Sequence, residues 1–144
     1  MNPFDWKAAL LAKHAQHVVM IHFPIALLIA GVVFDVLACL RKSHTLAAAA
    51  RYNLYAALLT CPLAVATGLL AWQWQLEGAK IKGNLLLHIL FAISSIAATA
   101  LLGWLHAKSQ TFPSLLRLFV GLGAIILITI TGHIGGFLSG VEAP

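Results

Sequence analysis

Charged side chains are scarce in this sequence. Asp, Glu, Lys and Arg together make up 9% of the 144 residues, and only four of them are acidic. A soluble domain carries roughly 25% charged residues, so this chain has too little polar material to cover a globule in water. The composition therefore excludes a soluble enzyme and a disordered tail.

Cysteine is also rare, with Cys39 and Cys61 as the two examples. Cys39 lies near the end of one apolar run and Cys61 near the middle of the next, so we expect them at different depths. Both are interpreted as small buried hydrophobic residues rather than as a redox or metal pair. A secreted disulfide scaffold is excluded as well.

Apolar residues are abundant instead. They make up 61% of the chain, and the mean hydropathy is +0.94. A helix needs about 20 apolar residues to cross the hydrocarbon core of a bilayer, and short connections make consecutive helices antiparallel. The sequence therefore predicts an all-α integral membrane protein, an up-down-up-down four-helix bundle that forms a single transmembrane domain over residues 1–144. The predicted spans are 18–40, 52–72, 85–105 and 118–138.

Residues 3–16 precede the first predicted span and mix apolar with charged side chains. Asn2-Pro3 is typical of a helix start. The segment has no small-residue cleavage site after an apolar core, so it is not expected to be a cleavable signal peptide. We expect an amphipathic helix that lies in the membrane interface.

The distribution of charge predicts the orientation of the chain. Side A is the membrane face where the first and third spans begin, and side B is the opposite face. Side B then carries five cations and no acid, and side A carries four cations and three acids. The positive-inside rule places side B in the cytoplasm and both termini outside the inner membrane of a bacterium. Because the cations lie between apolar runs, nucleic acid is not an expected partner. The side-B cations are Arg41, Lys42, Arg51, Lys108 and Arg117.

Three of the seven histidines are predicted at one depth. His22 and His88 lie near the starts of the first and third spans, and His133 lies near the end of the fourth. At 1.5 Å per residue, each lies about 5–8 Å inside side A. His17 lies just above them, at the start of the first span. Ionisable groups inside a bilayer usually mark a function, and imidazole suits haem, copper and zinc.

Inward-facing histidines on a four-helix bundle are a common way to build a cofactor site. We expect haem b, with its iron held by two of His22, His88 and His133, and with a second haem if His17 also ligates. Nearby glycines would let a flat macrocycle approach the backbone, and two lysines just outside His88 are candidate partners for its propionates. These six residues are Gly68, Gly132, Gly135, Gly136, Lys80 and Lys82.

Two alternatives to haem remain open. In one, His17, His22, His88 and His133 bind a bare copper or zinc ion, although copper(I) favours sulfur ligands and Met20 is the sulfur at hand. In the other, the protein is a cofactor-free structural or assembly subunit whose histidines bond to neighbouring helices. The sequence shows no catalytic constellation, so we expect an electron-transfer subunit rather than an enzyme.

Three polar residues belong to the side-B half of the chain. Asp35 lies about 20 Å deeper than His22. It is predicted to pair with Arg41, with Arg51 or with a backbone group of the second helix, and the alternative is a proton-delivery group near the cytoplasmic surface. His44 and His106 fall in the predicted side-B connections, where we expect them to be solvated.

The first span begins with His17-Val18-Val19-Met20-Ile21-His22-Phe23-Pro24-Ile25-Ala26-Leu27 and continues to Asp35. This segment resembles the start of a widespread bacterial four-span membrane family of unknown function, with His-Pro-x-x-x-His-Phe-Pro-Ile-Ala-Leu followed by an Asp. Thr67-Gly68, His88 and Gly135-Gly136 occupy the places of the family's later motifs. Val18 replaces the family's proline, and His133 stands where an aromatic or aliphatic residue is expected. The resemblance covers nearly the whole chain and implies the fold, but no activity.

These observations predict a haem b-binding membrane subunit. It would relay electrons between a redox partner protein at the extracytoplasmic face and quinone. Because the chain is small and nearly without loops, we expect it to work in a larger hetero-oligomeric complex, in contact with membrane lipid.

Overall fold

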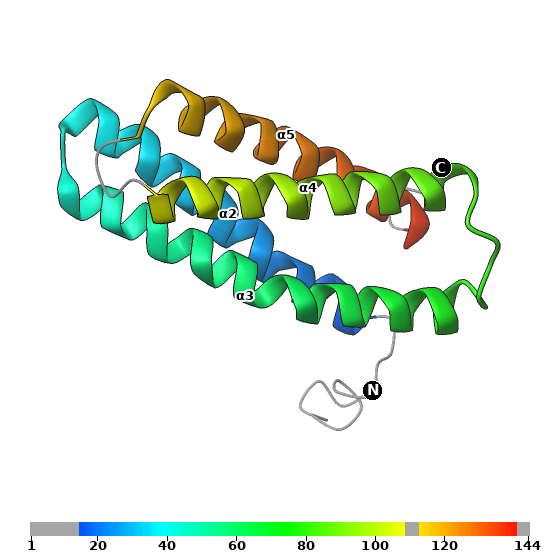
Figure 1. The fold of residues 1–144 in the computed structure, drawn as a ribbon. Coiled ribbons are helices and arrows are strands. Elements are labelled where there is room, and N and C mark those ends of the chain that lie inside the picture. The colour runs from blue at the N-terminus through cyan, green and yellow to red at the C-terminus, as the bar shows by residue number, and fades with distance from the viewer. Residues whose placement is uncertain (1–14, 109–112, 141–144) are drawn as a thin grey trace, which may run out of the picture.

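The computed structural model describes residues 15–108 and 113–140 of the chain (Figure 1). The described residues form four long helices, and each is long and apolar enough to cross a membrane. This confirms the predicted all-α four-span bundle. The interfacial helix expected at 3–16 falls almost wholly outside the described residues. The helices are α2 (Ala15–Arg41), α3 (His44–Gln75), α4 (Gly83–Lys108) and α5 (Leu115–Leu138).

The helices extend beyond the predicted spans, most clearly at side B. α3 begins at His44, inside a segment predicted as a connection, because Ser43 caps its first turn and accepts a hydrogen bond from the Leu46 N–H at 3.4 Å. The alanine-rich segment that follows has high helix propensity. Ser114 caps α5 in the same way by accepting from the Arg117 N–H at 3.4 Å. Both side-B connections are therefore shorter than predicted.

The bundle consists of two helical hairpins (Figure 1). α2 packs along α3, and α4 packs along α5, whereas contacts between the hairpins are fewer. The apolar core that joins the hairpins lies at or on the side-B side of the helix midpoints. It comprises Leu28, Val32, Leu54, Ala57, Leu102 and Ala124.

The side-A half of the bundle is packed less tightly. α3 has no buried residue between Ala57 and Ala71, and α4 has none between Leu85 and Ser95. In Figure 1 the hairpins lie closer together at the side-B end, on the left, than at the side-A end. The hairpins are thus held together mainly at side B, and apolar faces remain accessible between them at side A.

The two hairpins repeat one pattern of burial. When α2 is aligned with α4 at one constant offset along the chain, the buried positions of their overlapping described residues coincide. Aligning α3 with α5 matches three buried positions of each helix, whereas Ala47, Ala71 and Thr131 have no buried counterpart. Both first helices run from side A to side B, which is the relation of parallel repeats about an axis along the membrane normal. The corresponding buried pairs are Pro24/Ser95, Leu28/Thr99, Gly31/Leu102, Val32/Gly103, Asp35/His106, Ala50/Arg117, Leu54/Gly121 and Ala57/Ala124.

The close approach of α2 and α3 depends on Gly31. A Cβ at this position would lie 2.8 Å from Leu54 Cγ and 3.3 Å from the Ala50 carbonyl oxygen. We expect Gly31→Ala to lower the free energy of unfolding by about 1–3 kcal/mol through overpacking. Denaturant titration in detergent measures this loss. The matched control is Gly123→Ala, because a Cβ at Gly123 meets nothing within 4 Å. An unchanged stability of the Gly31 variant would contradict this packing.

Candidate functional site

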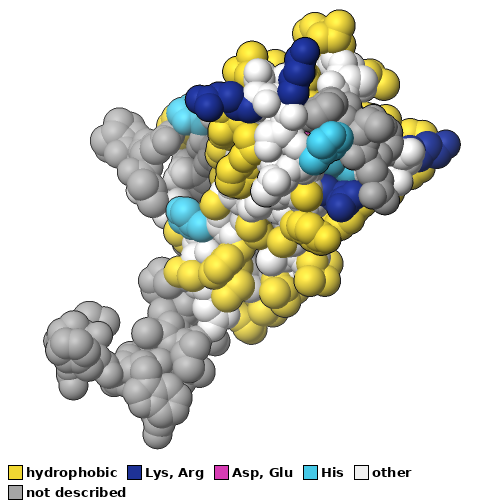
Figure 2. Space-filling model, turned by 90° about the vertical axis from the view of Figure 1, so that its left-hand side faces the viewer, with side chains coloured by type: hydrophobic (Ala, Val, Ile, Leu, Met, Phe, Trp, Pro, Cys, Tyr) yellow, Lys and Arg dark blue, Asp and Glu magenta, His cyan; other side chains and the backbone are white. Residues whose placement is uncertain are grey.

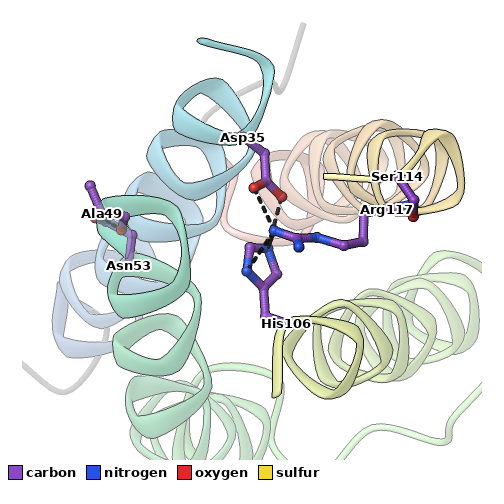
Figure 3. Close-up of polar contacts among 6 residues, drawn as sticks. All are labelled: Asp35, Ala49, Asn53, His106, Ser114 and Arg117. Carbon is purple, nitrogen blue, oxygen red and sulfur yellow. Dashed lines mark hydrogen bonds and ion pairs between the residues drawn. The ribbon is translucent and has the colours of Figure 1, made fainter. Parts of the chain in front are cut away.

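Three charged or ionisable side chains meet inside the bundle near side B (Figure 3). Arg117 Nη2 of α5 donates to Asp35 Oδ1 of α2 at 2.9 Å, and His106 Nε2 of α4 lies 2.8 Å from Asp35 Oδ2. Arg117 Nη2 also lies 2.9 Å from His106 Nδ1 and 3.1 Å from Nε2. The three residues are 1–3% exposed. This side-B cluster links one helix of the first hairpin to both helices of the second.

The side-B cluster corrects three sequence-based expectations. His106 was expected in a solvated connection, but α4 continues to Lys108 and turns the imidazole into the bundle. Arg117 was counted as a surface cation, but α5 begins at Leu115 and places it in the first helical turn, buried. Asp35 was expected to pair with an arginine at the end of its own helix or on α3. Its partners are His106 and Arg117 instead.

The hydrogen bonds of the cluster define its charge. Arginine stays protonated in proteins, so Nη2 donates one hydrogen to Asp35, and its other hydrogen lies within reach of both ring nitrogens of His106. Because Nε2 also contacts Asp35 Oδ2 at 2.8 Å, we assign the ring hydrogen to Nε2 and the acceptor role to Nδ1. The cluster therefore contains one carboxylate, one guanidinium and a neutral imidazole. Its net charge is zero, as burial in an apolar medium requires.

A second polar region lies at side A, in the seams of the two hairpins. His17 Nδ1 of α2 lies 3.2 Å from Thr67 Oγ1 of α3. The Thr67 hydroxyl already donates to the carbonyls of Leu63 and Ala64, so Oγ1 accepts from the His17 Nδ1–H. His88 Nδ1 of α4 donates to the Thr131 carbonyl of α5 at 3.1 Å. In both rings Nε2 keeps its lone pair.

Each of these imidazoles rests on a glycine of the partner helix. A Cβ at Gly68 would lie 3.0 Å from His17 Cε1, and a Cβ at Gly135 would lie 3.1 Å from His88 Cε1. Gly68 coincides with Gly135 in the alignment of α3 with α5, and His17 coincides with His88 in the alignment of α2 with α4. The two hairpins thus pack equivalent imidazoles against equivalent glycines.

The equivalent imidazoles lie at one level of the bundle. Both rings are half-buried. The stretch from His17 to Asp35 in α2 is as long as the stretch from His88 to His106 in α4. The side-A pair and the side-B cluster are therefore about 27 Å apart along the helices, close to the thickness of a bilayer core.

The other candidate residues occupy different places. His22 is exposed and its Nδ1 hydrogen-bonds the Val18 carbonyl of its own helix. His133 is also exposed and packs edge-on against Phe137 at a centroid distance of 5.0 Å. Within residues 15–108 and 113–140, no three metal-ligating side chains of the His, Cys, Asp and Glu types gather at one point. His22 and His133 thus differ from His88, which lies in the seam between α4 and α5.

The glycines and lysines of the expected site also lie in different surroundings. A Cβ at Gly132 would meet nothing within 4 Å, and Gly136 is half-buried near the end of α5. Lys80 and Lys82 are exposed in the side-A connection between α3 and α4. This connection is fixed by Trp72, whose Nε1 donates to the Ala79 carbonyl at 2.9 Å.

Comparison with known proteins identifies the family. The model of the family described as "Predicted membrane protein (DUF2231)" matches residues 13–142. The chain belongs to this family. Neither the curated proteins nor the solved structures gave a match. The family assignment agrees with the four spans of the fold and leaves its function to be argued from the two polar regions.

Removing one charged member of the side-B cluster leaves the other charge buried without its partner. We expect Arg117→Leu to lower the free energy of unfolding by about 3–5 kcal/mol. The double variant Asp35→Leu/Arg117→Leu should cost much less than the sum of the two single variants, because it leaves no isolated charge. A double-mutant cycle from denaturant titrations measures the difference. Strict additivity would contradict this assignment of charge.

The control for this cycle is Arg51→Leu. The Arg51 guanidinium lies 5.4 Å from the centre of the Tyr52 ring, outside the cluster. A cation–π contact of this exposed kind contributes about 0.5–1 kcal/mol, so the control variant should be only slightly destabilised.

Proposed function

We propose that the protein is a haem b-binding membrane subunit that relays electrons, and that His17 and His88 hold the iron. The observation that carries this proposal is the pair of Nδ1-anchored imidazoles, one from each hairpin. Histidines that ligate a metal usually donate their other ring N–H to a fixed acceptor, which sets the tautomer and the ring orientation. Thr67 Oγ1 and the Thr131 carbonyl are such acceptors.

The donor set fits haem better than a bare ion. Haem iron takes two axial imidazoles, whereas zinc and copper sites are built from three or four protein ligands. Each hairpin contributes one such imidazole, and among the described residues no group of three His, Cys, Asp or Glu side chains is placed to hold a metal ion. A bare copper or zinc centre is therefore less well supported than a bis-histidine haem.

The packing of the bundle supports the same assignment. The inner faces of α3 and α4 carry no buried residue over 58–70 and 86–94, so the side-A half offers apolar surface between the hairpins. A planar apolar macrocycle placed there would supply the contacts that the side chains do not make. Gly68 and Gly135 hold each imidazole against a helix backbone and keep the ligands in place.

A bound haem b would contribute one-electron oxidation and reduction of its iron. The protein would orient both ligands, exclude water through its apolar walls and insulate the centre from the side-B cluster. Lys80 and Lys82, exposed at the same membrane face, would supply positive charge for propionates. One haem per chain follows from one anchored imidazole per hairpin.

The partners follow from the position of the site. A centre near side A is within reach of a redox protein on that face. An open apolar groove of about 420 Å³ on α3 and α4 gives a membrane-dissolved quinone a surface to approach from the lipid. It is lined by Leu58, Cys61, Pro62, Val65, Ala66, Leu69 and Ile96. In this proposal the chain works within a larger membrane complex.

Spectroscopy of the purified full-length protein tests the haem proposal. The protein from haem-sufficient cells should show a Soret band and an α band that sharpens on reduction, with one haem per chain. His17→Ala and His88→Ala should each lose the low-spin spectrum or most of the haem, because each removes an axial bond. A colourless, fully folded preparation would leave the structural or assembly role as the function.

The exposed histidines provide the matched controls. His22→Ala and His133→Ala remove imidazoles at similar depth and should keep the low-spin spectrum and the haem content. His44→Ala, at side B, should also leave the spectrum unchanged. Loss of haem in the His22 or His133 variant would replace the proposed ligand pair, and two haems per chain would require these residues as additional ligands.

The orientation proposed for the inner membrane of a bacterium places side A and both termini outside the cytoplasm. Because Arg117 is buried, the cation count becomes four at side B against four at side A, and the two faces differ in that the side-A segments also carry acids whereas the side-B segments carry none. A reporter that is active only outside the cytoplasm should work when fused after Pro144. A cysteine introduced at Ser43 should be labelled only from the cytoplasmic side. The reverse labelling pattern would move the side-A site to the cytoplasmic face.

A further inference from the structure

The side-B cluster contains one more ionisable group than charge neutrality needs. Asp35 and Arg117 already neutralise each other through a 2.9 Å hydrogen bond. His106 nevertheless bridges the two, accepting from Arg117 at Nδ1 and donating to Asp35 at Nε2. In this assignment Arg117 occupies the Nδ1 lone pair, the position at which the ring would take up a proton.

Protonation of His106 would change the partners within the cluster. A proton on Nδ1 would remove the ring's acceptor and place an imidazolium charge beside Arg117 Nη2, which lies 2.9 Å from Nδ1 and 3.1 Å from Nε2, so the two cations would repel each other and the guanidinium would withdraw. The imidazolium would then be neutralised by Asp35, with which it already shares a 2.8 Å contact. The buried pair remains neutral, and the positive charge that leaves is that of Arg117.

The guanidinium of Arg117 is placed so that it can move from the cluster to the side-B surface. Arg117 is the third residue of α5, about one helical turn from the side-B surface, and its N–H is bonded to the capping residue Ser114. A long arginine side chain near a helix end can extend its guanidinium to water while its methylene groups remain in apolar surroundings. The shorter side chains of His106 and Asp35 have no comparable route, and Asp35 also lies six residues before the end of α2 at Arg41.

We propose that the side-B cluster is a proton-binding site in which His106 takes up one proton from the side-B surface and Arg117 is displaced as the exchanged cation. The cluster has two neutral arrangements, one with Asp35 paired to Arg117 and one with Asp35 paired to the His106 imidazolium. Uptake transfers a proton from water to Nδ1 and breaks the Arg117–His106 hydrogen bond. This proposal is independent of the haem proposal.

The surroundings of His106 are compatible with this exchange. Asp35 faces it from α2 and Arg117 faces it from α5. The nearby charges of α3 and α4 are held on aromatic rings, Arg51 over Tyr52 at 5.4 Å and Lys108 over Trp104 at 4.5 Å. Figure 2 shows this end of the molecule with its exposed Lys, Arg and His side chains. Among the described residues no exposed acid lies there, so Asp35 is the counter-ion for both arrangements.

Solid-state NMR of the full-length chain in lipid bilayers tests the exchange. The chain carries ¹⁵N-labelled histidine and guanidino-¹⁵N-labelled arginine, and is measured in D₂O from about pH 8 to about pH 5, the range in which histidine titrates. At high pH, the histidine signal that is absent from His106→Gln should be the neutral Nε2–H tautomer, and one of the three arginines should be protected from exchange. On acidification this histidine should become doubly protonated, and the arginine should lose its protection over the same pH range.

The matched variant is His106→Gln. A glutamine amide can accept from Arg117 and donate to Asp35 as the neutral imidazole does, but it takes up no proton. In this variant the protected arginine should stay protected across the whole range. His44, an exposed histidine at the same end, provides the control variant His44→Gln, in which arginine exchange should follow pH as it does in the wild type.

Two results would overturn the proposal. One is a wild-type His106 that stays neutral over the whole range in the folded protein. The other is protonation of His106 while Arg117 remains protected. Both are read from the wild-type chain, so the test stands even where a cluster variant fails to fold.

Discussion

The pairing of Asp35 with Arg117 is the interaction on which the arrangement of the bundle depends. In hydrocarbon, a lone guanidinium or carboxylate carries a large desolvation cost, and each residue makes the other tolerable. Because Asp35 is on α2 and Arg117 on α5, neutrality is reached only when the two hairpins dock. The apolar core at the same end of the bundle adds area to this contact, but helices surrounded by lipid gain little from apolar contact alone. The ion pair thus determines which faces meet.

The hairpins themselves are stabilised differently. Small residues let their helices approach closely, as Gly31 does with Leu54, and hydroxyl groups satisfy polar atoms within the seams. Ser95 and Thr131 lie 3.2 Å apart between α4 and α5 while each also bonds its own helix. His17 and His88 join these seams as further polar contacts. At side A, the polar contacts described here are made within each hairpin. The polar contacts between the hairpins lie at side B, in the cluster of Asp35, His106 and Arg117.

The four spans were predictable from the sequence, because length and hydropathy alone decide whether a helix crosses a bilayer. The side-B cluster was not, because the predicted spans stopped at Leu105 and began again at Leu118. Those limits left His106 and Arg117 in a connection. The spacing from His17 to Asp35 is repeated from His88 to His106, and this repeat in the sequence indicates that His106 belongs inside the helix.

Among the side-A histidines, the sequence placed each near one end of its helix but did not give the direction in which it points. His22 is exposed and His88 lies in the seam between α4 and α5, and the contact of Asp35 with His106 places His88 level with His17 rather than with His22. Direction depends on the rotation of each helix about its axis, which the packing against the partner helix determines. Gly68 packs against His17 and Gly135 packs against His88. These two pairs could be recognised only after the helices were placed together.

The correspondence between the hairpins has a consequence for how such a chain can be built. Asp35 corresponds to His106, and Ala50 corresponds to Arg117. Two copies of the first hairpin would bring two carboxylates to the central axis, and two copies of the second would bring two guanidiniums there. Neither homodimer could neutralise its own interior. The departure from symmetry at these positions makes each half the obligatory complement of the other, and a single polypeptide supplies both halves in equal number.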